Sequence, residues 1–193
     1  SGTNALSISF KDDGPSAALA GTPTTASATL DETGGLGSAT ISAANVTGLF
    51  STAYGTDGAG STVYGLSATD GAQTGLFLAG ADTSVAANEI RLVAISASQY
   101  EGWTDGDTTN GTKAFTVAIA TGTGEITITQ HAALEHGTDG TGTAHDDSLS
   151  LSGAAALSAT VTVTDQDGDT ATLTASGTNA LSISFKDDGP SAA

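Results

Sequence analysis

The sequence predicts an all-β fold, an antiparallel β-sandwich with at most one short helical turn. Apolar side chains recur at every second position in several runs, which is typical of strands with one buried face. Thr is abundant within these runs and favours strands. The glycines fall mostly between the runs, so many short strands are separated by turns, as in β-sandwich domains.

The predicted strands can be placed in order along the chain. The more continuous apolar run Glu89–Ser96 predicts an interior strand. The stretch Thr121–Gly124 lies between two alternating runs and is typical of a hairpin connection. Only Gln130–Glu135 predicts a helical turn. The alternating runs cover residues 6–10, 113–120, 125–130, 157–163 and 181–185, and shorter strands are marked by Leu66, Leu76, Leu78, Leu149 and Leu151.

Composition predicts a thin core and excludes several classes of protein. The chain has 193 residues, which suits one domain or two small ones, and fewer than one residue in five is Leu, Ile, Val or Phe. The formal net charge of −17 excludes a nucleic-acid binder with a basic surface and a polybasic membrane anchor. The absence of Cys excludes disulfides and thiolate sites. So acidic a chain with so few large apolar residues needs another source of stability.

The chain contains its own repeat. Residues 1–18 and 176–193 are identical at all 18 positions, SGTNALSISFKDDGPSAA. This identity predicts a tandem array of near-identical units, of which the chain holds one full repeat and an overlap. The spacing of 175 residues between the two copies suits a complete domain rather than a solenoid unit. We therefore expect neighbouring repeats of the same chain as the domain's partners.

The joint between repeats is predicted at the recurring DDGPS segment, Asp12–Ser16 and Asp187–Ser191. Its Gly allows a sharp turn, and its Pro stops a strand and stiffens the connection. The chain then divides into the last strand of a preceding repeat (1–11), the linker (12–16), one β-sandwich repeat (17–186) and the start of the next linker (187–193). Without its own domain, the 1–11 strand should be mobile or pair with a neighbouring molecule; otherwise we expect a monomer.

The acidic residues cluster in turns. Two carboxylates about 4 Å apart repel by about 4 kcal/mol at an effective dielectric near 20, so such clusters indicate a bound cation. In Thr164–Asp169 (TDQDGD), alternate Asp residues can direct several oxygens at one hard ion. Ca²⁺ fits because it takes about six to eight oxygen ligands in a flexible shell, whereas Mg²⁺ demands a near-ideal octahedron. A plain acidic turn is the alternative. The motif differs from an EF-hand loop, since its Gly comes fourth and no Glu closes it.

Further acidic pairs are candidate ligands near the joint. Asp187 and Asp188 follow the final strand, and Asp12 and Asp13 hold the same place one repeat earlier. These pairs can bind Ca²⁺ together with turns of the adjoining domain, the alternative being a solvated hinge. The full set of candidate calcium ligands is Asp12, Asp13, Asp31, Glu32, Asp57, Asp146, Asp147, Asp165, Asp167, Asp169, Asp187 and Asp188.

Other chemistry has weaker support in the sequence. The chain has no HExxH, GxSxG or phosphate-binding GxxxxGK[ST] motif, so we expect no catalytic residues. The three histidines (His131, His136 and His145) favour ordinary single roles over a zinc or catalytic cluster. Tyr100 and Trp103 predict core or edge packing, with a sugar-stacking platform as the alternative.

The combination VTVTDQDGDTATLTA, then SISFKDDGPSA, resembles the tandem repeats of giant RTX adhesins. LDETGG, GTDGAG, TGEITITQHAALEH and HDDSLSL are similar to further parts of the long form of that repeat, so the resemblance covers most of the unit. The RTX nonapeptide GGxGxDxUx is absent, so the chain does not resemble the calcium-binding β-roll of such proteins.

The resemblance implies an immunoglobulin-like or cadherin-like sandwich stabilised by calcium. It implies a non-catalytic extender that projects ligand-binding domains from the surface of a Gram-negative cell, in cell adhesion and biofilm formation. Such adhesins leave the cell by type I secretion, with a C-terminal signal, which agrees with the lack of a visible N-terminal one. Carried onto this chain, the motifs make Asp165, Asp167 and Asp169 calcium ligands, with Asp187 and Asp188 and their equivalents Asp12 and Asp13.

Two other functions stay open. A calcium-dependent glycan-binding or cell-binding module predicts an exposed aromatic side chain near a calcium site. A secreted hydrolase predicts a cleft that holds a carboxyl or His with a perturbed pKa. The sequence favours the extender, because an array whose purpose is reach gains from added copies.

Overall fold

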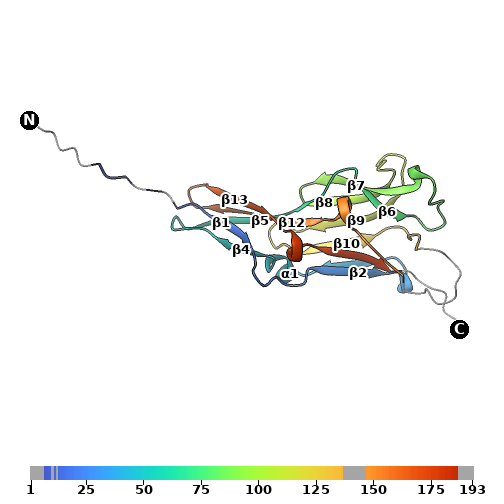
Figure 1. Cartoon of the computed structure of the whole chain (residues 1–193), viewed down its shortest axis with the longest axis horizontal. Coiled ribbons are helices and arrows are strands. Elements are labelled where there is room, and N and C mark those ends of the chain that lie inside the picture. Colours follow the sequence, from blue (N-terminus) through green and yellow to red (C-terminus); the bar gives the residue numbers. More distant parts are fainter. Residues whose placement is uncertain (1–6, 10, 12, 137–146, 187–193) are drawn as a thin grey trace, which may run out of the picture.

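A computed structural model of the chain describes residues 7–9, 11, 13–136 and 147–186. The body is elongated, and the described chain enters it at β1, at one end, and leaves it at the end of β14, at the other (Figure 1). The strands are β1 (Ser16–Leu19), β2 (Ser27–Asp31), β3 (Ser38–Ile41), β4 (Phe50–Ala53), β5 (Ala59–Ser67), β6 (Gln73–Phe77), β7 (Glu89–Ser96), β8 (Gln99–Thr104), β9 (Lys113–Ile119), β10 (Ile126–Gln130), β11 (Ser148–Ser150), β12 (Ser158–Asp165), β13 (Thr170–Thr174) and β14 (Ser182–Lys186).

The described strands form four sheets. The largest has six strands in the order β3-β10-β9-β8-β7-β6, and every neighbouring pair in it is antiparallel. Two three-stranded sheets, β11-β14-β2 and β13-β12-β5, and the pair β1-β4 complete the body. The expected all-β sandwich is therefore confirmed. Among the described strands, β2 and β14 form the one parallel pair, and both run toward the end at which the described chain leaves the body.

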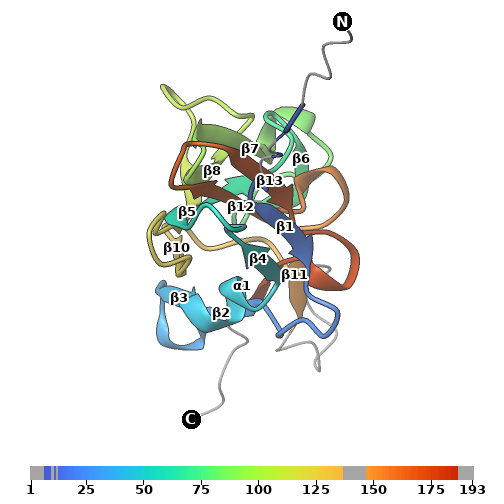
Figure 2. The same ribbon diagram turned by 90° about the vertical axis from the view of Figure 1, so that its left-hand side faces the viewer.

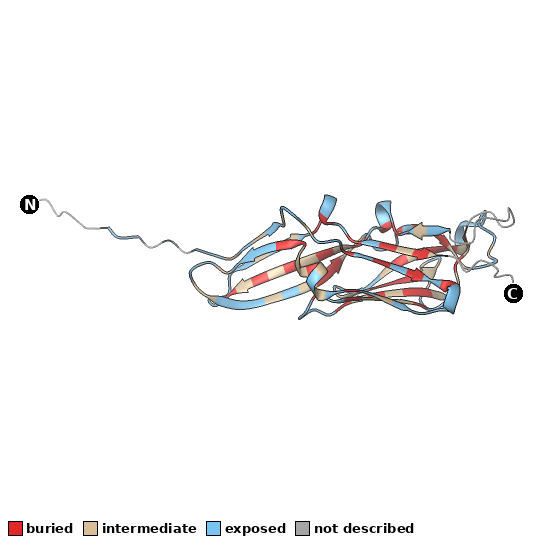
Figure 3. Cartoon of the chain, turned by 90° about the horizontal axis from the view of Figure 1, so that it is seen from below, coloured by how far each residue is buried: buried red, intermediate tan, exposed pale blue. Residues whose placement is uncertain are grey.

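The core follows the alternation in the sequence. Along β12 every second residue is buried, from Ala159 through Val161 and Val163 to Asp165. Buried and more exposed residues alternate in the same way along other strands of the body (Figure 3). Phe115 of β9 and Phe185 of β14 are fully buried with ring centroids 5.2 Å apart, so they join the six-stranded sheet to the β11-β14-β2 sheet. The expected interior strand and hairpin are also confirmed, as β7 between β6 and β8 and as the β9–β10 pair.

The predicted helical turn at Gln130–Glu135 is wrong. Gln130 ends β10, and Leu134 forms an isolated antiparallel bridge with Leu78 of the segment after β6. The Glu32 carboxylate accepts hydrogen bonds from the Gln130 side chain and the Leu134 amide, so distant contacts hold this segment instead of helical ones. The only α-helix among the described residues is α1 (Ala43–Thr47), with Ser42 as its N-cap.

The short strands β1 to β4 were not predicted, because their Ala, Ser and Thr residues carry little hydrophobic signal. No described helix is both long enough and apolar enough to cross a membrane.

The repeated segment has two environments. Ile183 in β14 is 2% exposed, whereas Ile8, at the same place in the first copy, is 67% exposed. The described residues 7–9 and 11 belong to no strand. The expectation of mobility or strand pairing for residues 1–11 falls largely outside the described residues and stays a prediction.

Candidate metal site

The turn between β12 and β13 gathers three carboxylates. Oxygens of Asp165, Asp167 and Asp169 all lie within 4.8 Å of one another. Gly168, with φ of +104°, lets the chain reverse here, and Asp165 Oδ1 accepts the amides of Gly168 (3.0 Å) and Asp169 (2.8 Å). These contacts fix the Asp165 carboxylate at the base of the turn, while Asp167 and Asp169 lie at the surface.

The strongest indication that a cation binds in this turn comes from Asp165. Its side chain is buried, and its second oxygen, Oδ2, accepts no hydrogen bond. Burial raises the pKa of the Asp165 carboxyl. Its interactions with the Asp167 side chain and with the amides of Asp169 and Gly168 lower the pKa by more, so the net pKa lies below the usual value. An ionised, buried carboxylate oxygen without a partner is costly, and a cation in the turn would compensate it.

The linker passes beside this turn (Figure 2). A Cβ built on Gly14 would lie 3.6 Å from Asp169 Oδ2, and one built on Gly55 would overlap the backbone oxygen of Asp13. Gly55 has φ of +77°, so both its backbone conformation and the available space require glycine. The linker and the loop before β5 are thus in direct contact.

The same loop contacts the acidic turn. The amide of Gln166 donates to the oxygen of Gly58 at 3.2 Å. In the adjoining strand β5, a Cβ on Gly60 would overlap the backbone oxygen of Asp165. Asp57 lies in this loop, directly before Gly58. The structure therefore brings Asp13, Asp57 and the 165–169 turn to one end of the body, and Asp165, Asp167 and Asp169 are the three whose carboxylates converge.

Other predicted ligands lie where the described chain leaves the body. Lys186, the last residue of β14, is paired with Asp31 of β2 and with Ser148 of β11, and Asp147 precedes Ser148. Thr33 side-chain and amide hydrogen bonds lower the pKa of Asp31. Glu32 is buried and accepts the Leu134 amide at 3.0 Å. The predicted ligands Asp12, Asp146, Asp187 and Asp188 lie outside the described residues.

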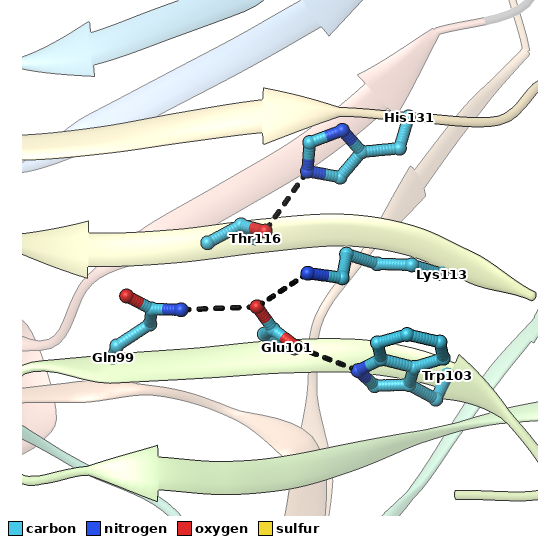
Figure 4. Close-up of polar contacts among 6 residues, drawn as sticks. All are labelled: Gln99, Glu101, Trp103, Lys113, Thr116 and His131. Carbon is cyan, nitrogen blue, oxygen red and sulfur yellow. Dashed lines mark hydrogen bonds and ion pairs between the residues drawn. The ribbon is translucent and has the colours of Figure 1, made fainter. Parts of the chain in front are cut away.

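Tyr100 and Trp103, whose alternative role is a sugar-stacking platform, both have partners within the protein. Tyr100 is buried, and its hydroxyl accepts the Ala68 amide. Trp103 donates its Nε1 hydrogen to Glu101 at 2.7 Å, and Lys113 Nζ lies 5.0 Å from its ring centroid (Figure 4). Glu101 also accepts from Lys113 and Gln99, so this cluster satisfies its own polar groups. Its residues therefore have a clear structural role.

The sequence did not single out the glycines that shape the site. Gly55 and Gly58 both have positive φ, and both approach groups from distant parts of the chain. GTDGAG was visible as a motif, but only the tertiary structure shows that it touches both the linker and the acidic turn.

A family model described as "Domain of unknown function (DUF5801)" matches residues 27–176. The chain belongs to the DUF5801 family. The matched DUF5801 region includes the whole 165–169 turn and the Asp57 loop, while Asp13 and β14 lie outside it. No curated protein and no solved structure matches the chain.

An oxygen-only donor set of this kind suits a hard cation. Three carboxylates that converge at one turn match the oxygen ligands that Ca²⁺ takes. No nitrogen or sulfur donor belongs to the cluster, which disfavours zinc. The residues present therefore fit a calcium ion.

Proposed function

We propose that the domain is a non-catalytic extender repeat of a long bacterial adhesin of the RTX type, folded and stiffened by Ca²⁺. In this proposal it works outside a Gram-negative cell after type I secretion, its partners are neighbouring repeats, and its role is to hold ligand-binding domains away from the cell. It contacts neither nucleic acid nor membrane and has no active site.

The contact between the linker and the acidic turn is the observation that carries this proposal. Asp13 and Gly14 precede β1 and lie against Gly55 and Asp169, where the carboxylates converge. A cation bound there would hold the linker to the body and fix the direction of the preceding repeat. Because the described chain enters and leaves at opposite ends, successive repeats would extend in a line (Figure 1).

Charge gives a reason for the calcium dependence. A chain with a net charge of −17 and a thin core has little stability from burial alone. Metal binding would add its free energy to folding, about 2.7 kcal/mol for a site at 100 times its Kd. Where calcium is scarce, inside the cell, the chain would stay unfolded and ready for export.

Calorimetric melting tests this proposal. The chain is melted in excess EGTA, in millimolar Ca²⁺ and in millimolar Mg²⁺. A large rise in Tm with Ca²⁺ alone, or folding only with Ca²⁺, is the expected result. An equal, cooperative melt in all three solutions would rule out the calcium-dependent extender. Binding of glycans or cells by this single repeat would instead support the calcium-dependent binding module.

A further inference from the structure

A hollow of about 280 Å³ lies where β5 and β12 meet the turns that follow β7 and β9. It is open to solvent, and its volume is near the lower end of the range for small-molecule sites. Among the described residues that line it, none belongs to the 165–169 turn. The hollow is therefore a separate feature from the candidate metal site.

Backbone contacts hold the hollow open. The Tyr64 amide donates to the Thr121 oxygen at 2.8 Å, and the Leu66 amide donates to the Ala97 oxygen at 2.7 Å. Both turns are thus tied to the edge of β5 that β12 leaves free. A Cβ at Gly65, between these two contacts, would lie 3.0 Å from the Ala97 oxygen and closer still to a hydroxyl of β12, so glycine keeps the space empty. A site already formed in this way spends little binding free energy on ordering.

The lining of the hollow is uncharged, although the net charge of the chain is −17. The overall negative field would repel an anionic ligand, and a cationic ligand would find no carboxylate in the hollow. Hydroxyl groups are its main polar side-chain groups, and they belong to Ser96, Ser98, Thr121, Thr160 and Thr162. The Ser96 and Ser98 hydroxyls lie 3.1 Å apart. Because a hydroxyl both donates and accepts hydrogen bonds, even a paired one keeps capacity for a ligand.

These features suit a neutral saccharide. The hydroxyls of a sugar ring also donate and accept, so they match the Ser and Thr hydroxyls of the lining. The C–H groups of the ring can cover Val63, which is 47% exposed, and the neighbouring Ala97. An added peptide strand fits less well, because it would need free amides along β5, and those of Tyr64 and Leu66 already donate to the two turns.

We propose that this hollow binds neutral saccharides, such as a short stretch of an uncharged polysaccharide. The site goes beyond the extender role, and it differs from a calcium-dependent glycan site, which would lie beside the acidic turn. The Tyr64 ring packs against Phe50, with centroids 6.5 Å apart, so we expect no stacking platform and weak binding by a single repeat. Tandem copies would raise the avidity for a long polysaccharide, and that gain alone rests on the proposed function.

The test is an NMR titration of the isotope-labelled whole chain in saturating Ca²⁺. The probes are maltohexaose and cellohexaose, which are neutral, and trigalacturonate, which is acidic. We expect at least one neutral hexaose, at millimolar concentration, to shift the amide signals of Gly65, Ala97 and Ser98. Trigalacturonate should leave these signals unchanged. The absence of shifts with both neutral hexaoses would overturn the proposal.

Thr162→Glu places a carboxylate in the hollow. A bound sugar would desolvate this carboxylate, so binding should weaken about tenfold or more. Thr127→Glu is the matched control, because Thr127 is also a half-buried Thr of a central strand, β10, and does not line the hollow. If Thr162→Glu fails to fold, Ala97→Glu in the exposed turn replaces it. Equal affinity in the hollow variant and in Thr127→Glu would overturn the proposal.

Two further outcomes would assign the binding elsewhere. Shifts confined to the 165–169 turn would overturn the proposal and support the calcium-dependent binding module. Shifts at the hollow that grow with protein concentration, without any sugar, would show that a second copy of the chain occupies it. The calcium response is measured by melting in the absence of sugar, so the saccharide site and the calcium-dependent extender can fail independently.

Discussion

The backbone oxygen of Asp13 lies so close to Gly55 that no side chain at position 55 could fit between them. The two residues belong to the linker and to the loop before β5. This contact holds the linker beside the acidic turn, where Gly14 approaches Asp169. In the proposed function, this backbone contact would couple the joint between repeats to the metal site without the help of a side chain at position 55.

Replacing Gly55 by Ala should displace the linker. A Cβ would strike the Asp13 oxygen and would also occupy a backbone with φ of +77°, which costs about 1–3 kcal/mol for the conformation alone. Gly71→Ala is the matched control, because Gly71 has φ of +73° and nothing within 4 Å of its Cβ position. Isothermal titration should show weaker Ca²⁺ binding for Gly55→Ala only. Equal calcium affinities in the two variants would show that linker contact does not support the site.

Asp165→Asn should remove much of the calcium response. The buried Asp165 is the carboxylate at the base of the turn, so neutralising it weakens a cation site while leaving an oxygen for the turn amides. At 100 times the original Kd, up to about 2.7 kcal/mol of calcium-linked stability should be lost. The control is Asp107→Asn, since Asp107 also accepts the amides of its own turn, those of Thr109 and Asn110. The melting temperatures of the two variants are measured with and without Ca²⁺. An equal loss of the calcium-dependent rise in Tm in both variants would contradict the assignment of Asp165 as a calcium ligand.

The two copies of the repeated segment should respond differently to the same substitution. Ile183→Ala empties a 2% exposed position in the core and should cost about 2–5 kcal/mol. Ile8→Ala changes a 67% exposed side chain in the identical sequence context and should alter stability by less than about 0.5 kcal/mol. Urea unfolding measures both. A comparable loss from Ile8→Ala would mean that the first copy also packs against a folded surface.

Glu101 should contribute to the pH dependence of stability. Burial raises its pKa, but hydrogen bonds from Lys113, Trp103 and Gln99 lower it by more, so the folded pKa lies below 4.5 (Figure 4). A lowered pKa in the folded state stabilises the fold above pH 4.5 and loses that contribution as the pH falls through the folded value.

Glu101→Gln should therefore reduce stability at pH 7 and flatten its decline in acid. Urea midpoints between pH 3 and pH 7, compared with the original chain, measure the effect. Parallel curves for the two proteins would show that Glu101 keeps its ordinary pKa in the fold.

Local pattern was enough to predict much of this fold. The alternation of Leu157, Ala159, Val161 and Val163 predicted β12, and the Thr121–Gly124 stretch predicted the turn after β9. These features depend on neighbouring residues, so they are readable without knowing the rest of the chain. The same approach placed a helical turn at Gln130–Glu135, where hydrogen bonds to Glu32, about a hundred positions away, prevail.

The candidate metal site was likewise predicted in part from local sequence and completed only by the tertiary structure. The TDQDGDT motif by itself brought Asp165, Asp167 and Asp169 together, because alternate residues of one tight turn must lie close. The sequence also determined the repeat, its period and the concentration of acidic residues in turns. Only the tertiary structure decided that the linker and Gly55 meet this turn, and that His136 is buried beside Glu32. Those contacts join residues far apart in the chain, and their distances depend on how the sheets pack.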